Sequence, residues 1–388
     1  MTVLNLPVSG GDVEPLSLSD PKDWPVDPAA YNRTIYAAAH VVADPLADVD
    51  PWLEPAIDWD RTIAFREHLW DLGLGVAEAM DTAQRGMGLT WSNSLELIQR
   101  SVAAQRARGG SALMACGAGT DHLAPAPGLT VDDVIAAYEE QCQAVEKAGG
   151  RIILMASRAL AAIAKSPDDY GKVYDRVLSQ VAEPVIIHWL GEMFDPALQG
   201  YWGSDDHMEA METCLQILTR NASKIDGIKI SLLSADKEIA MRRRLPDGVV
   251  MYTGDDFNYP ELIEGDDQGY SHALLGIFDA IAGQAAGAMT ALGQDDLRRY
   301  HEIFDPTVPL SRHIFKAPTR FYKTGVVFLA YLNGFQDHFT MIGGQESTRS
   351  TLHLADLLRL ANAAGALKDP EQAAARARPV FASRGVEI

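Results

Sequence analysis

The sequence has few cysteines. Its 388 residues include three, Cys116, Cys142 and Cys214, which are scattered along the chain. An odd, dispersed set gives neither a disulfide framework nor the closely spaced pairs of a zinc site. We therefore expect the chain to fold around a hydrophobic core, for which hydrophobic residues at 47% of the sequence are sufficient.

Positive charge and long apolar runs are also scarce. Lys and Arg number 33 against 53 Asp and Glu, which gives a formal net charge of −20. Such a surface repels phosphate backbones and anionic lipids, so we expect no nucleic acid partner and no membrane partner. No apolar stretch approaches the ~20 residues of a membrane span. Residues 1–20 lack the basic and apolar regions of a signal peptide, so the sequence predicts a cytoplasmic protein.

What the sequence does contain is a regular alternation of strand-like and helical segments. The strand-like runs are residues 34–42, 75–80, 111–117, 151–157, 184–190, 227–233, 248–254 and 273–279. Eight strands, each followed by a helical segment, predict an α/β protein with a closed (β/α)8 TIM barrel. The alternative, an open doubly wound sheet, calls for a glycine-rich phosphate loop after the first strand, where this chain has the acidic run AHVVADPLADVDP.

The helical segments also divide the chain. Residues 130–150 begin with Thr130 as a helix N-cap before acidic residues and end in glycine. After about residue 285 the pattern is helical throughout. We therefore predict an N-terminal arm at 1–30, the barrel at 31–285 and a C-terminal helical extension at 286–388. The arm is typical of an oligomer contact or a disordered end.

Functional residues of a TIM barrel lie at the carboxyl ends of its strands. Polar or aromatic residues near the predicted strands are Asp81, Thr82, Arg85, His188, Trp189, Lys229, Tyr252, Asp255 and His272. Several have an ordinary structural interpretation. His188 is as compatible with a hydrogen-bonded core residue as with a catalytic one, Trp189 with simple packing, and Arg85 with a surface charge. We expect Asp256, which follows Asp255, to cap a turn or helix.

Lys229 is the exception. In the run DGIKIS (226–231), strand alternation places it on the face opposite Ile228 and Ile230. Lysine is seldom fully buried, and an apolar environment lowers its pKa. A neutral amine attacks a carbonyl group and forms an imine, which withdraws electrons from the neighbouring bonds. Such chemistry needs a proton shuttle but no cofactor. The structural alternative is a salt bridge inside the barrel.

Four short motifs resemble those of a known family. They are GIKIS at 227–231, TGDD at 253–256, CGAGT at 116–120, and residues 81–84 in a loop after the second strand. In order and spacing they resemble the dihydrodipicolinate synthase / N-acetylneuraminate lyase superfamily, and most closely a divergent, uncharacterised branch of it. The resemblance runs from about residue 34 to 279 and into the C-terminal helices. It implies a Schiff-base barrel enzyme in which Lys229 forms the imine, and a homodimer or homotetramer.

The departures from the family pattern are informative. His188 stands where the family has a proton-relaying tyrosine, so the mechanism would be altered. Asp81 stands where the family has a hydroxyl that holds the substrate carboxylate, and a carboxylate would be repelled there. Either Arg85 compensates, or the substrate is not a simple 2-oxo acid. The segment after the fifth strand adds Phe194, Tyr201 and Trp202, which suit either a sugar-like substrate or a structural loop.

The sequence therefore predicts a lyase, aldolase or dehydratase acting on a small keto acid or a sugar-derived carbonyl compound. Lys229 would be the nucleophile and His188 the acid/base, with Tyr252 a second choice of relay. The predicted binding residues are Asp81, Thr82, Arg85, Trp189, Asp255 and His272. Two alternatives remain open. One is a metal-dependent barrel enzyme with ligands from Glu78, His122, His188 and Asp255, and the other is a non-catalytic binding barrel.

Overall fold

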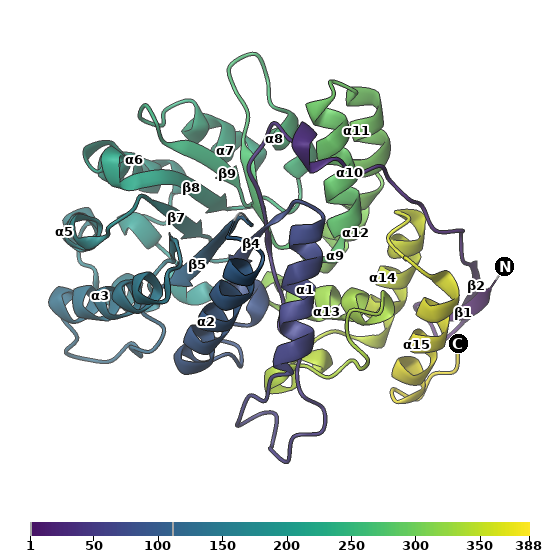
Figure 1. Cartoon of the computed structure of the whole chain (residues 1–388). Helices are drawn as coiled ribbons and strands as arrows, with labels where there is room; N and C mark the ends of the chain where they lie inside the picture. The colour runs from purple at the N-terminus through teal and green to yellow at the C-terminus, as the bar shows by residue number, and fades with distance from the viewer. Residues whose placement is uncertain (1, 111) are drawn as a thin grey trace.

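The computed structural model describes residues 2–110 and 112–388, and its centre is a closed barrel (Figure 1). The barrel strands are β3 (Ile35–Ala38), β4 (Gly75–Glu78), β5 (Met114–Ala118), β6 (Ile152–Leu154), β7 (Val185–Leu190), β8 (Ile225–Ser231), β9 (Val250–Thr253) and β10 (His272–Leu275). Each pairs in parallel with the next, and β10 closes the ring on β3. The predicted (β/α)8 barrel is confirmed.

The last strand ends earlier than the sequence predicts. We expected it to run from 273 to 279, but β10 ends at Leu275 and helix α9 (Ile277–Ala280) follows. Gly276 has helical dihedrals, and the N–H of Ile277 donates to Asp256 Oδ1 at 2.8 Å, which fixes the turn. Ser111, the first residue of the predicted third strand, lies outside the described residues.

Helices connect the strands around the outside of the barrel. They are α1 (Trp59–Asp71), α2 (Trp91–Ala107), α3 (Val131–Ala148), α4 (Arg158–Ile163), α5 (Pro167–Gln180), α6 (His207–Arg220), α7 (Ala235–Arg242) and α8 (Tyr259–Glu264). Helix α3 begins as predicted, because Thr130 and Asp133 form a reciprocal capping box. It ends at Gly149, whose φ of 93° favours glycine.

The barrel strands separate two groups of buried side chains. Tyr36, Ala77, Ala115, Ile186 and Leu274 belong to a small cluster that fills the barrel interior. Their strand neighbours belong to the larger cluster between strands and helices, as Ile228 and Ile230 do. The alternation therefore sends Lys229 inward, as the sequence indicates.

The C-terminal third is helical and lies beside the barrel (Figure 1). It comprises α10 (Ala282–Gly293), α11 (Leu297–Phe304), α12 (Thr307–Ile314), α13 (Tyr322–Leu332), α14 (Thr351–Ala363) and α15 (Pro370–Ala382). Every residue of α13 is buried, which makes it the central helix of this region. The predicted division at residue 285 falls within α10.

The N-terminal segment forms a hairpin of β1 (Val3–Pro7) and β2 (Val13–Ser17), drawn beside α14 and α15 in Figure 1. Leu4 and Leu6 are fully buried. Arg359 of α14 donates to the carbonyls of Leu6 and Pro7 at 3.0 and 3.1 Å. This arm therefore packs on its own chain. Among the described residues, no helix combines the length and the apolar character that crossing a bilayer requires.

Candidate active site

Lys229 lies inside the barrel on β8. The parallel register sets it beside His188 of β7 and Tyr252 of β9, and it is 7% exposed. Gly254, directly after β9, leaves room for it, because a Cβ there would lie 2.7 Å from Lys229 Cε and 2.5 Å from the carbonyl oxygen of Ile230. The glycine of the TGDD motif thus makes space for the lysine side chain.

The charge state of Lys229 reflects two opposing influences. Burial lowers the pKa of its ammonium, and the nearby carboxylates of Asp256 and Asp81 raise it. The net effect is a lowered pKa, because the loss of hydration outweighs the two attractions. The neutral amine is therefore more accessible than in an exposed lysine.

Asp256, rather than Asp255, is the aspartate whose charge acts on Lys229. Burial raises the pKa of Asp256 to about 7, which allows it to exchange a proton near neutral pH. Asp255 has a different role from the one expected. Its carboxylate accepts from the N–H groups of Phe257 and Asn258 at 2.8 and 3.1 Å, and so caps the turn into α8. Asp256 also makes the capping contact that the sequence predicts, because it accepts from the N–H of Ile277 at the start of α9.

His188 lies next to Lys229 as predicted, in an environment that keeps its ring neutral. Its Nε2 is 3.2 Å from Ser231 Oγ, and its buried Nδ1 has no partner among the described residues. Burial lowers the pKa of His188 well below its usual value, and the positive charge of Lys229 lowers it further. A neutral imidazole of this kind can donate or accept a hydrogen bond more readily than it can hold an added proton.

The loop after β4 brings Asp81 and Thr82 to the same end of the barrel. They form the short 3-10 helix η2 (Asp81–Ala83). Thr82 Oγ1 lies 2.8 Å from the hydroxyl of Tyr322, at the start of α13. Burial raises the pKa of Tyr322 well above its usual value, and the charges of Asp81 and Asp256 raise it further. The charges of Asp81 and Asp256 thus act on both Lys229 and Tyr322.

Sequence reasoning missed Tyr322. It lies 93 residues beyond Lys229, within a helix whose apolar sequence carries no catalytic motif. Only the packing of α13 against the barrel brings it near. Gly276 precedes Ile277, the residue whose N–H donates to Asp256. A side chain at Gly276 would place its Cβ 3.3 Å from the Tyr322 ring.

Arg85 is committed to structural contacts. Its Nε and Nη2 donate to the two carboxylate oxygens of Asp121 at 3.1 and 2.6 Å. Its Nη1 donates to the carbonyls of Ala79 and Gly117, and Nη2 also donates to Gln141. These contacts leave Arg85 little capacity to bind a substrate carboxylate, although it lines the cavity described below.

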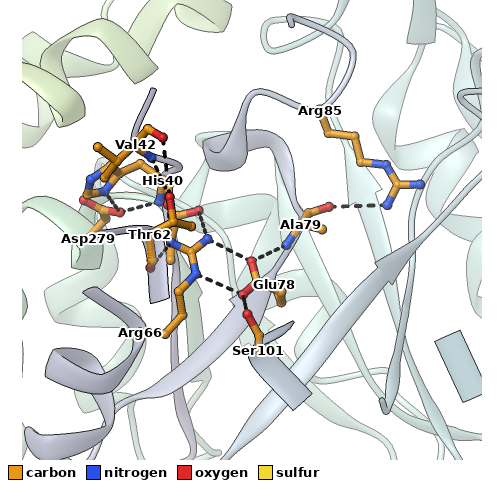
Figure 2. Close-up of polar contacts among 10 residues, drawn as sticks. His40, Val42, Thr62, Arg66, Glu78, Ala79, Arg85, Ser101 and Asp279 are labelled. Carbon is orange, nitrogen blue, oxygen red and sulfur yellow. Dashed lines mark hydrogen bonds and ion pairs between the residues drawn. The ribbon is translucent and has the colours of Figure 1, made fainter. Parts of the chain in front are cut away.

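A buried ion pair holds the loop that carries Asp81 (Figure 2). Arg66 of α1 donates from Nε and Nη2 to the two oxygens of Glu78, each at 2.9 Å, and both side chains are fully buried. Glu78 Oε1 also accepts from the N–H of Ala79 at 2.8 Å. Ala79 has a φ of 53°, which is unusual for a residue with a Cβ. The ion pair and Arg85 together hold this strained residue, two positions before Asp81.

Three other predicted site residues lie elsewhere. Tyr252 points toward the amino-terminal end of the barrel, where its hydroxyl donates to Asp226 at 2.7 Å. His272 begins β10 at that same end and accepts from the N–H of Thr34 at 2.9 Å. Trp189 faces outward, because its neighbour His188 faces inward, and it packs edge-on against Trp202. We therefore remove these three from the set of residues that meet at Lys229.

The aromatic segment after β7 is mainly structural. The Tyr201 hydroxyl accepts from the N–H of Ser157 at 3.1 Å and contacts the Tyr174 hydroxyl at 2.9 Å. Trp202 is fully buried. Phe194 alone reaches the site, where it packs edge-on against the Tyr322 ring.

The four residues proposed as metal ligands do not converge. Glu78 binds Arg66, Asp255 caps its own turn, and His122 lies 2.7 Å from Gln141. Within residues 2–110 and 112–388, no three His, Cys, Asp or Glu side chains gather closely enough to hold a metal ion.

A cavity of about 220 Å³ opens at this end of the barrel. Its lining includes His188, the strand neighbour of Lys229, and Asp81, whose charge acts on Lys229. The lining also includes Arg158, which is ion-paired with Asp195. A second buried lysine, Lys323, follows Tyr322, and its Nζ donates to the carbonyl of Arg320 at 3.2 Å. The lining of this cavity combines two arginines, Arg85 and Arg158, with Asp81, Asp121 and Asp195, and its volume suits a small molecule.

Comparisons with known proteins agree with this architecture. A search of curated protein sequences found no match. A dihydrodipicolinate synthase from Oceanobacillus iheyensis matches with 14% identity and a TM-score of 0.61, covering 84% of this chain and 95% of that chain. A putative dihydrodipicolinate synthetase from Pseudomonas aeruginosa matches with 17% identity and a TM-score of 0.63, covering 86% and 99%.

A third structure is YagE, a prophage protein of the dihydrodipicolinic acid synthase family from E. coli K12, in complex with pyruvate. It matches with 13% identity and a TM-score of 0.65, covering 85% of this chain and 97% of that chain. At these identities the likeness concerns the fold, and it confirms the fold resemblance that the sequence motifs indicate. A family model described as "Protein of unknown function (DUF993)" matches residues 4–386, so the chain belongs to that family and has the barrel fold of the dihydrodipicolinate synthases.

Proposed function

We propose that this protein is a Schiff-base-forming lyase or aldolase, or a dehydratase with the same intermediate, that acts on a small carbonyl compound through Lys229. The observation that carries the proposal is a lysine buried inside the barrel, with a lowered pKa, under the charge of a buried aspartate whose pKa is raised to about 7. One group supplies a nucleophile, and the other can exchange protons near neutral pH.

The reaction begins with attack of Lys229 Nζ on the carbonyl carbon of the substrate. The carbonyl oxygen leaves as water, and an iminium ion remains. The iminium then takes up the electron pair of a neighbouring C–H or C–C bond, which gives an enamine. Cleavage of a C–C bond makes the enzyme an aldolase, and loss of a hydroxyl group from the enamine makes it a dehydratase. Hydrolysis by water restores the lysine.

Proton transfer in these steps is assigned to Asp256 and Tyr322. Asp256 interacts electrostatically with Lys229 and can take up or release a proton at neutral pH. The Tyr322 hydroxyl contacts Thr82 and supplies a phenol at the end of the barrel where β7 provides His188. The neutral ring of His188 is assigned to hydrogen bonding rather than to net proton uptake.

The proposal is tested by proton exchange. Ketones and 2-oxo acids are incubated with the protein in D2O, and loss of the α-proton signal is followed by NMR. The wild type should catalyse exchange, and Lys229→Met should abolish it. Lys323→Met removes another buried lysine with a lowered pKa and should retain exchange.

Two outcomes would redirect the assignment. Exchange that persists in Lys229→Met but stops on addition of a chelator would favour the metal-dependent enzyme. Stabilisation by a ligand without any exchange would favour a non-catalytic binding barrel.

A further inference from the structure

Asp81 is a carboxylate without a hydrogen-bond donor. Among the described residues, no group donates to either of its side-chain oxygens, and Oδ2 is buried. The side chain lines the cavity with His188, and its charge raises the pKa of Lys229. A buried carboxylate oxygen that lacks a donor is costly, and a bound ligand can supply the missing hydrogen bond.

The cations near Asp81 are engaged with other groups. Arg85 binds Asp121 through two hydrogen bonds, and Arg158 is ion-paired with Asp195. Lys323 donates to the Arg320 carbonyl at 3.2 Å and to Met87 Sδ at 3.4 Å. None of the three forms an ion pair with Asp81 within the described part of the chain.

Because none of these cations is paired with Asp81, its charge acts directly on a ligand bound next to Lys229. Asp256 adds a second carboxylate on the same lysine. A carboxylate attached to the reacting carbonyl would come close to the carboxylate of Asp81, of Asp256 or of both. Like charges close together repel each other, which disfavours binding of such a substrate. A hydroxyl in the same position would instead donate to Asp81.

We infer that Asp81 selects carbonyl substrates bearing a neutral hydrogen-bond donor next to the carbonyl, as in an α-hydroxyketone or a ketose, over 2-oxo acids. This inference rests on the proposed imine at Lys229 and names the substrate class for that same site. The substituent on the imine carbon donates to Asp81, and the rest of the molecule extends into the cavity.

A matched pair of ketones tests the inference. Hydroxyacetone and pyruvate are both three-carbon methyl ketones, and they differ in carrying CH2OH or a carboxylate. Each is incubated with the protein and borohydride, whose hydride adds to the imine carbon and leaves a secondary amine on Lys229. The extent of adduct at Lys229 is measured by mass spectrometry across a concentration series, and the ratio between the two ketones is the readout.

The wild type should favour hydroxyacetone. Asp81→Asn removes the charge with little change in shape, and should shift the ratio toward pyruvate by about tenfold or more, the factor for one pK unit of charge repulsion. Asp81→Ser is a second variant in case the amide perturbs the loop. Glu192→Gln removes one charge from a partly exposed carboxylate that contacts His207, and should leave the ratio unchanged.

Two results would overturn the inference. A wild-type preference for pyruvate, or a ratio that is the same in both Asp81 variants as in the wild type, would show that Asp81 does not select the substituent while leaving the Lys229 imine intact. Absence of any adduct from both ketones at wild-type Lys229 would overturn the proposed function itself, and this inference with it.

Discussion

Two consecutive aspartates, Asp255 and Asp256, have different partners. Asp255 holds the turn into α8 through Phe257 and Asn258, whereas Asp256 accepts from the N–H of Ile277 and its charge acts on Lys229. The same residue type, one position apart, is structural in one case and a proposed acid/base in the other.

This contrast gives a matched pair of substitutions. Asp256→Asn should lower the rate of α-proton exchange by about 10²-fold or more, the usual contribution of a general acid or base. It should also remove any change in rate centred near pH 7, where Asp256 titrates. Asp255→Asn should mainly lower the free energy of unfolding, by about 1 kcal/mol. Rate–pH profiles and urea denaturation of both variants check this, and equal rates in the two would contradict it.

Single-residue assignments from the sequence succeed where local alternation decides them. Lys229 and His188 face inward because strand geometry allows little else. The contacts of Asp256 could not be predicted in the same way, because Ile277, whose N–H donates to Asp256, lies more than twenty residues away. Arg85 was left open for a similar reason, since its partners Asp121 and Gln141 come from later in the chain.

At the scale of elements, helix α13 completes the site from outside the barrel. Its first residue, Tyr322, brings a buried phenol to Thr82. Sequence patterns predicted the helical extension, but nothing in them shows which helix lies against the candidate site. That information lies in tertiary packing, where α13 is buried on all sides.

Tyr322→Phe tests the role of this helix. The variant should lose about 10²-fold in α-proton exchange, because a proton-transferring hydroxyl is removed. Its stability should fall by only about 1 kcal/mol, the net value of one hydrogen bond. The control is Tyr259→Phe, which removes another buried Tyr–Thr contact, to Thr307. If the two variants lost activity equally, Tyr322 would have no special part in the chemistry.

The Glu78–Arg66 pair that holds the β4 loop can be compared with a surface pair of the same type (Figure 2). Glu78→Gln leaves Arg66 buried without its counter-charge and should cost about 3–5 kcal/mol of unfolding free energy. Glu96→Gln breaks a pair with Arg100 in which both side chains are nearly half exposed, and should cost less than about 1 kcal/mol. Urea denaturation measures both values, and similar costs would mean that the loop is not held by this pair.

At the scale of the whole molecule, the order of strands and helices could be predicted from the sequence. The full set of residues at the candidate site could not. Eight strand-like runs separated by helical segments predict a closed barrel, because few other folds use that pattern. The hairpin at residues 3–17 was not expected. Its strands are short, and Leu4 and Leu6 are buried only because α14 lies against them.

The stability of the molecule should depend on pH through Glu238. Burial raises the pKa of this carboxyl to about 8, although it accepts hydrogen bonds from Ser271 and Thr253. Between about pH 5 and 8 the folded state therefore holds a proton that the unfolded chain has released. Folding stability then falls as pH rises through this window, with a slope of up to about 1.4 kcal/mol per unit.

Glu238→Gln removes that titration. The unfolding free energy of the variant minus that of the wild type should be larger at pH 8 than at pH 5. The amide carries no charge at either pH, whereas the wild type loses stability between them. Chemical denaturation at the two pH values gives the comparison. If this difference in unfolding free energy were the same at pH 5 and pH 8, Glu238 would not be protonated in the folded state.

The central claim is that Lys229 forms a covalent imine with a carbonyl substrate. The most direct measurement is reduction with borohydride in the presence of hydroxyketones, ketoses and 2-oxo acids, followed by peptide mapping. The account predicts an adduct with the mass of a substrate skeleton on the peptide that contains Lys229, and none in Lys229→Met. An adduct confined to Lys323, or no adduct from any of these compounds, would contradict it and leave Lys229 as a buried structural charge.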